Sequence, residues 1–141
     1  MSAFSEAELA YPSEARRLGR LATVGADGTP HVVPVGLSYS QEHDSIDVRG
    51  RDLQTTKKYR DVERTGRAAI VVDDVVSTNP WRVRGIEVRG RAHALDGSRP
   101  LIRIHPERIV SWGIHSGELG VLHSREVRAC GFKPRRPSAR V

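Results

Sequence analysis

The stretch that decides the fold runs from residue 21 to residue 39 and reads LATVGADGTPHVVPVGLSY. Residues 21–24 form a short β-prone run, and residues 25–28 have the composition of a turn. Over residues 31–39 the side chains of Val33, Val35, Leu37 and Tyr39 recur at every second position. That period places one face of a strand against a core. Two strands joined by a glycine-rich turn predict a β-hairpin.

Two residues in the second strand restrict what can lie beside it. Pro34 has no backbone N–H to donate to a β-ladder, so this part of the strand is expected at a sheet edge or a bulge. Gly36 has no side chain, so another group can approach the backbone closely there. The centre of this strand is therefore predicted to be a place of close backbone approach.

Two helices are predicted around the strands. The pattern over residues 5–18 predicts the first helix. Ser5 is its expected N-cap, and Glu8 follows three residues later, as in a capping box. Pro12 is expected to break or kink this helix. Residues 52–64 are polar and helix-compatible, and Gly66 is a suitable residue to end that helix.

The remaining pattern predicts short strands. They are expected over residues 46–50, 67–76, 84–95, 102–104 and 108–114, with Pro106 as an interruption and no strand after His115. About six short antiparallel strands with two or three helices favour a mainly β fold, a small barrel. An open sheet would instead leave edges that need protection.

Length and composition limit the class of protein. A chain of 141 residues is the size of one domain, and 38% apolar residues are enough for a core. No run reaches the roughly 18–20 apolar residues that a membrane helix needs. The only cysteine, Cys130, excludes an intramolecular disulfide. With no leader sequence recognised, we expect a cytoplasmic protein without a membrane span.

The positive charge is concentrated near the C-terminus. Residues 125–141 hold six basic side chains and one acid, and so carry +5 of the net charge of +6. We therefore expect a nearly neutral domain over residues 1–115 and a basic, flexible tail over residues 116–141. The neutral body and its seven aromatic residues argue against nucleic-acid binding, which relies on stacking platforms.

The segment from residue 51 to residue 58, RDLQTTKK, carries the clearest chemical signal. Thr55 and Thr56 precede Lys57 and Lys58 at the expected start of a helix, a grouping suited to binding a phosphate. A capped helix with a solvated basic first turn accounts for the same residues equally well. Lysines at a helix N-terminus are unfavourable, and a bound anion would offset that cost.

Other candidate residues are less informative. Trp81 follows Asn79 and Pro80 in an expected loop, where it is a packing anchor or a stacking surface for a planar ring. Trp112 is expected in the core or at a subunit interface. The six histidines show no metal-ligand spacing, and we find no nucleophile–base motif. No catalytic residue is predicted, and no metal site.

The order and spacing of four segments resemble the pyridoxamine-phosphate-oxidase-like split β-barrel family. The segments are residues 20–35, 56–69, 81–92 and 103–113, and the resemblance covers roughly residues 4–115. The last segment, RIHPERIVSWG, resembles the actinobacterial branch that uses the deazaflavin coenzyme F420. The C-terminal substrate-binding stretch of the oxidase itself is not found in residues 113–141, which argues against oxidation of pyridoxamine phosphate.

The resemblance implies a homodimer of six-stranded antiparallel split β-barrels, with two equivalent cofactor sites at the subunit interface. Lys58 would bind the cofactor phosphate, helped by Arg51, Thr55, Thr56 and Lys57. The ring would lie along Val33, Pro34, Val35 and Gly36, flanked by Trp81 of the other subunit. The proton that accompanies the hydride could come from Ser38, Tyr39 or a water molecule.

The resulting hypothesis is an F420-dependent oxidoreductase that transfers a hydride between the deazaflavin and a small organic substrate. Such chemistry needs orientation and water exclusion more than a protein nucleophile. The first alternative is a flavoprotein that binds FMN on the same fold, since both cofactors present a phosphate near a tricyclic ring. The second is a non-catalytic protein that binds a cofactor or haem.

Overall fold

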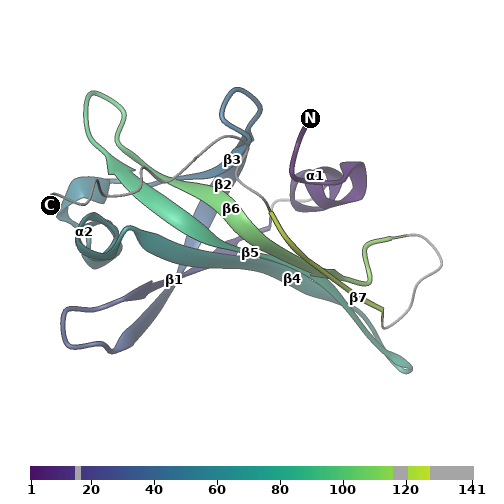
Figure 1. Cartoon of the computed structure of the whole chain (residues 1–141). Coiled ribbons are helices and arrows are strands. Elements are labelled where there is room, and N and C mark those ends of the chain that lie inside the picture. Colours follow the sequence, from purple (N-terminus) through teal and green to yellow (C-terminus); the bar gives the residue numbers. More distant parts are fainter. Residues whose placement is uncertain (15–16, 116–120, 128–141) are drawn as a thin grey trace, which may run out of the picture.

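The computed structural model describes residues 1–14, 17–115 and 121–127. In chain order the elements are α1 (Glu6–Ser13), β1 (Gly19–Val24), β2 (Pro30–Ser40), β3 (Ser45–Arg49), the 3-10 turn η1 (Leu53–Thr55), α2 (Lys57–Thr65), β4 (Arg67–Thr78), β5 (Trp81–Leu95), β6 (Leu101–Trp112) and β7 (Leu122–Glu126). The two helices lie on different sides of a strongly curved sheet (Figure 1).

Six strands close into a ring. Their order is β3-β2-β1-β4-β5-β6, and β3 pairs with β6 to complete the circle. All these pairings are antiparallel. The predicted mainly β barrel of six antiparallel strands with two helices is thus confirmed.

The barrel interior is filled by the inward-facing side chains of alternating strand residues. Leu21, Val48, Ile102, Ile104 and Ile109 have no exposed surface. Apolar burial of this kind is the main favourable term in folding, at roughly 25 cal/mol per Å². η1 and α2 cover one side of the barrel through three buried side chains: Leu53, Tyr59 and Val62.

β2 changes partner halfway along its length. Its first half pairs with β1, from Pro30 to Val35, and its second half pairs with β3, from Gly36 to Ser40. On the edge where β3 would continue, the first half of β2 therefore pairs with no strand of the described residues. Pro34 lies on that open half, which confirms its expected place at an edge.

The strand predictions need three corrections. Pro106 does not interrupt β6, which runs unbroken, because the irregularity is absorbed as a register shift opposite Arg89 and Gly90. Trp81 is not in a loop but begins β5, directly after the Asn79–Pro80 turn. The strand predicted to begin at residue 84 thus begins three residues earlier, within a long β4–β5 hairpin.

Two further differences lie near the chain ends. The Ser5 cap and the Glu8 capping box are present, but α1 ends at Ser13 rather than continuing to residue 18. Pro12 has no N–H for the helix and lies in its last turn, which accounts for the early end. No strand was predicted beyond His115, yet residues 122–126 form β7 against β6. The rest of the expected tail, residues 116–120 and 128–141, lies outside the described residues.

Candidate functional site

The two threonines before α2 build the turn that starts the helix. Thr56 is the N-cap, and its Oγ1 accepts a hydrogen bond from the backbone N–H of Tyr59 at 3.4 Å. The same oxygen donates to the carbonyl of Leu53, and Thr55 Oγ1 donates to the carbonyl of Asp52 at 2.8 Å. Both hydroxyl protons are therefore used within the turn, so the structure gives these side chains a local role.

Lys57 is paired with a carboxylate of its own helix. Its Nζ lies 3.1 Å from both side-chain oxygens of Asp61, which is 2% exposed. Asp61 also accepts hydrogen bonds from Thr23 at 2.9 Å and from Arg64 at 3.4 Å. Burial would raise the pKa of Asp61, but the hydrogen bonds from Lys57 and Thr23 outweigh it and lower that pKa. The cost of a cation in the first helical turn is thus offset for Lys57 by Asp61.

Lys58 differs from its neighbour. It is half-buried, and within the described part of the chain its ammonium makes no hydrogen bond or ion pair. The backbone N–H groups of Lys57 and Lys58 occupy the first two helical positions, which have no acceptor within the helix. The helix N-terminus thus carries two amides without a helical acceptor and a lysine whose ammonium is unpaired among the described residues. This donor set fits an anion.

Two arginines, Arg49 and Arg51, shortly precede this helix in the chain, and a third, Arg99, is joined to Arg49 by a hydrogen bond. Sequence reasoning found only Arg51. Arg51 follows β3 directly and is exposed. Arg49 ends β3, and its Nη1 donates to the carbonyl of Arg99 at 3.1 Å. That bond holds the β5–β6 turn against the segment that leads into η1 and α2. Arg49 and Arg99 are 50 residues apart, so no local pattern could have paired them.

The central residues of β2 alternate as predicted. Val33 and Val35 face the core, whereas Pro34 and Gly36 are exposed. A Cβ placed on Gly36 would meet nothing within 4 Å, so the outer surface of the strand is open at this point. Gly36 pairs with Arg49, two residues before Arg51. The register therefore brings the proposed ring-binding strand and the segment leading to Lys58 into one region.

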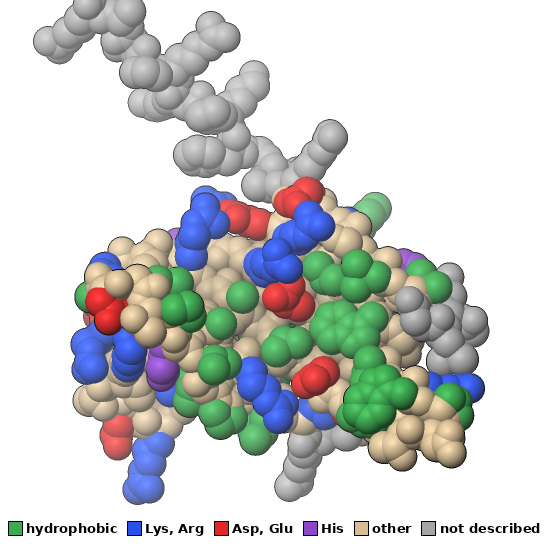
Figure 2. Space-filling view, turned by 90° about the horizontal axis from the view of Figure 1, so that it is seen from below, with side chains coloured by type: hydrophobic (Ala, Val, Ile, Leu, Met, Phe, Trp, Pro, Cys, Tyr) green, Lys and Arg blue, Asp and Glu red, His purple; other side chains and the backbone are tan. Residues whose placement is uncertain are grey.

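Trp81 is also a predicted site residue, but within one chain it lies away from the other predicted site residues. It stands at the tip of the β4–β5 hairpin, which extends away from α2 (Figure 1). Its side chain is 67% exposed, and Val75, Val76 and Val83 near the same tip are also exposed. In Figure 2, apolar side chains gather on the side where this hairpin ends. We call these four residues the hairpin-tip patch.

Two classes of site are absent from the described part of the chain. No three histidine, cysteine or carboxylate side chains within it are grouped so that they could hold a metal ion. No helix within it has the length and apolar character needed to cross a membrane.

The site is therefore a helix terminus whose donors suit an anion, on a small closed barrel with one exposed strand segment, and these are the features of the split-barrel class of fold. The chain belongs to the pyridoxamine 5'-phosphate oxidase family, whose model matches residues 5–113. The family predicted from the sequence is thereby confirmed.

Similar proteins define the class further. The chain is 42% identical over 135 residues to the 5a,11a-dehydrotetracycline/5a,11a-dehydrooxytetracycline reductase of Streptomyces rimosus, covering 89% of this chain and 94% of the relative. That reductase is an oxidoreductase, the class predicted from the sequence.

Solved structures agree on the fold. A heme binding protein from Mycobacterium smegmatis has a TM-score of 0.64 at 15% identity, covering 89% of this chain and 60% of the other. A protein described as an F420 reductase has a TM-score of 0.55 at 21% identity, covering 77% and 98%. Because these two proteins bind different groups, the fold alone does not choose the cofactor.

Proposed function

We propose that this chain is a reductase that uses the deazaflavin coenzyme F420 to reduce a small organic acceptor. The observation that carries the proposal is the Lys58 ammonium, unpaired among the described residues, at a helix N-terminus whose first two amides have no helical acceptor. The reductase from Streptomyces rimosus supports the reaction class. When bound, the reduced coenzyme supplies the hydride.

The protein's own contribution is binding and orientation. Lys58 and the first amides of α2 would hold the cofactor phosphate, and Arg49, Arg51 and Arg99 would raise the positive potential around it. The backbone at Pro34 and Gly36 would lie against the ring. Lys57 would act indirectly, by neutralising Asp61 and stabilising the start of the helix.

The two side chains considered as proton sources, Ser38 and Tyr39, have different surroundings. Ser38 lies on the same outward face of β2 as Gly36, and its hydroxyl makes no hydrogen bond to any described residue. The Tyr39 side chain faces the other way, and its hydroxyl donates to Asp44 at 2.6 Å. That hydrogen bond is the main cause of the raised pKa of Tyr39. Ser38 is therefore the better placed group to orient a water molecule or the acceptor.

We further propose that the functional unit is a homodimer. Trp81 lies far from the Lys58 region of its own chain, so it can flank a cofactor only across a subunit interface. The hairpin-tip patch offers an apolar surface for such a contact. Two equivalent sites would then form at one interface.

The test is a titration of the purified protein with F420 and, separately, with FMN, followed by tryptophan fluorescence. Trp81 and Trp112 are the two tryptophans, so a Trp81→Phe variant separates their signals. We expect saturable quenching by F420, a weaker response to FMN, and loss of most of the quenching in Trp81→Phe. Tighter binding of FMN would replace this proposal with the flavoprotein alternative. No response to either cofactor would overturn it.

A further inference from the structure

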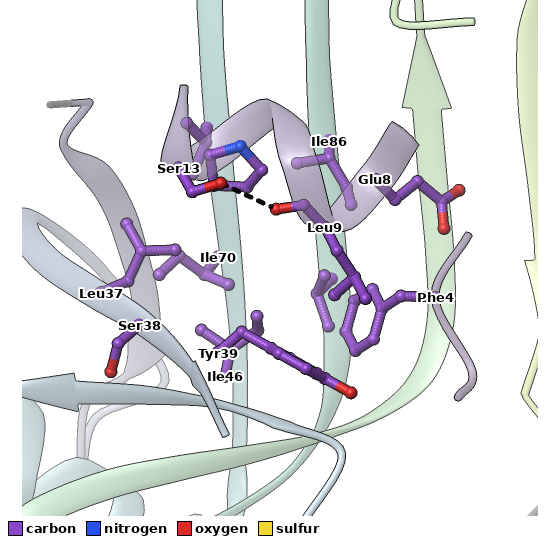
Figure 3. Close-up of a pocket in the computed structure, with 13 residues that line it drawn as sticks. Phe4, Glu8, Leu9, Ser13, Leu37, Ser38, Tyr39, Ile46, Ile70 and Ile86 are labelled. Carbon is purple, nitrogen blue, oxygen red and sulfur yellow. Dashed lines mark hydrogen bonds between the residues drawn. The ribbon is translucent and has the colours of Figure 1, made fainter. Parts of the chain in front are cut away.

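A cavity of about 90 Å³ lies between α1 and the barrel wall. α1 covers it from outside, and inward-facing residues of four strands form its floor. Figure 3 shows side chains from both sides directed toward this space. The apolar lining consists of Phe4, Leu9, Pro12, Leu37, Tyr39, Ile46, Ile70, Val72, Ile86 and Val88.

The helix over the cavity is held mainly at its two ends. At one end the buried carboxylate of Glu8 accepts hydrogen bonds from Ser111 at 3.1 Å and from Arg125 at 2.8 Å. At the other end the hydroxyl of the buried Tyr11 donates to Asp74. These polar contacts fix the position of α1 above the strands without filling the space beneath it.

The polar groups around the cavity are already engaged. The Glu8 carboxylate points away from the space in Figure 3 and is bound by Arg125. Ser13 Oγ donates to the carbonyl of Ala10 at 2.9 Å, and Tyr39 donates to Asp44. Ser38 stands at the rim with its hydroxyl directed away (Figure 3). The cavity therefore offers apolar contacts and no free hydrogen-bonding group to a ligand inside it.

We infer that this cavity is a binding site for a single apolar ring. An apolar cavity stays dry and takes up apolar ligands, and one of about 150 Å³ in another protein binds benzene. The cavity here is smaller, at about 90 Å³, but it is open on one side, so a ring can extend toward the mouth. Filling it replaces empty space by van der Waals contacts with the lining.

Apart from Ser38 at its rim, this site is distinct from the proposed cofactor site. Side chains alternate along β2, so Leu37 and Tyr39 reach the cavity while Pro34 and Gly36 face the opposite side of the strand. The inference concerns the protein without any cofactor and does not rest on the proposed reductase activity.

The test is a titration of the cofactor-free protein with benzene, followed by methyl carbon–proton NMR spectra. We expect saturable shifts of the Leu9, Ile70 and Ile86 methyl groups and a rise in the midpoint of thermal unfolding. Benzoate has the same ring with a charge, and it should produce neither effect because its carboxylate would be buried without a partner.

Two variants locate the binding. Leu9→Phe places a larger side chain over the cavity and should abolish the saturable shifts. Leu18→Phe makes the same change at an exposed position, where the side chain is 52% exposed, and should leave them intact. Shifts spread over the surface valines, no saturation in the wild-type protein, or unchanged binding in Leu9→Phe would each overturn the inference. The wild-type and Leu18→Phe titrations decide the question even if Leu9→Phe fails to fold.

Discussion

Lys57 and Lys58 are adjacent in the sequence, yet the structure gives them different surroundings. The ammonium of Lys57 is bound to a buried carboxylate, whereas that of Lys58 is unpaired among the described residues. A matched pair of alanine variants should therefore separate a structural role from a ligand-binding role.

We expect Lys58→Ala to weaken F420 binding at least tenfold, because a hydrogen bond to a charged group contributes about 1.5–3 kcal/mol. Its free energy of unfolding should change by less than about 0.5 kcal/mol, as for other surface substitutions. Lys57→Ala should instead lower the free energy of unfolding by about 1–3 kcal/mol, since the buried Asp61 loses a donor. Fluorescence titration and urea unfolding of both variants provide the comparison. A larger loss of F420 affinity in Lys57→Ala than in Lys58→Ala would contradict the assignment.

Gly36 and Gly90 offer a second contrast at the scale of single residues. A Cβ on Gly90 would lie 1.8 Å from the carbonyl oxygen of His105, while a Cβ on Gly36 would meet nothing within 4 Å. Gly90→Ala should therefore destabilise the fold by about 3 kcal/mol or more, through overpacking against backbone. Gly36→Ala should leave the unfolding midpoint nearly unchanged but weaken F420 binding, since the methyl group would occupy the place of the ring. Unchanged F420 affinity in Gly36→Ala would rule out the ring position that we propose.

At the scale of elements, α1 and β7 are joined by an ion pair between Glu8, which is 1% exposed, and Arg125. Burial alone would raise the pKa of Glu8, but hydrogen bonds from Arg125 and Ser5 lower it below its usual range. A lowered pKa means that the pair contributes stability above the unfolded pKa of about 4.3, and that this stability is lost as the pH falls through the folded pKa.

Arg125→Ala should lower the free energy of unfolding at pH 7 by about 3 kcal/mol, because it leaves a buried carboxylate without its cation. The deficit should shrink as the pH falls from about 4.3 through the lowered folded pKa of Glu8, because protonation removes the charge that Arg125 binds. Urea unfolding of the wild-type protein and of Arg125→Ala at several pH values gives the difference directly. Arg108→Ala on β6 removes an exposed ion pair and serves as the control, with a small effect at every pH. A deficit independent of pH would contradict this account of the pair.

Elements with a local signal could be predicted from the sequence. The β1–β2 hairpin has alternating apolar residues and a turn at Gly28, which has a positive φ of 82°. Gly66, also at a positive φ, ends α2 as expected. β7 has no such signal, because its five residues are mostly polar. It forms where β6 extends past the end of β3, which leaves an edge that another strand can pair with.

The candidate site was predictable to the same extent. Lys58 and Gly36 lie in segments whose composition indicates their chemistry. The pairing of Lys57 with Asp61 competes with the phosphate role, although its spacing of four residues is visible in the sequence. The backbone of Arg99 meets the side chain of Arg49 only through the closure of the barrel. The same closure creates the cavity beneath α1. Neither the contact between Arg49 and Arg99 nor this cavity could therefore be predicted from a local sequence pattern.

At the scale of the whole molecule, the proposed cofactor site needs a second copy of the chain. The hairpin-tip patch is the surface that we expect to be covered in the dimer. Val76 is 55% exposed and lies in the irregularity between Val75 and Ser77, so a charge there should not disturb the core. Val76→Glu should therefore convert a dimer into a folded monomer, because it buries an unpaired charge in the interface. Sedimentation equilibrium measures the change in mass.

The dimer also links this prediction to cofactor binding. If Trp81 flanks the cofactor of the partner chain, Val76→Glu should weaken F420 binding and reduce the tryptophan quenching together, and raising the protein concentration should restore both. Leu95→Glu is the matched control, since Leu95 is 39% exposed at the far end of β5 and should leave mass and affinity unchanged. A monomeric wild-type protein that still binds F420 with strong Trp81 quenching would show that the site is complete in one chain. The open half of β2 and Lys58 would then suffice, and the hairpin-tip patch would need another partner.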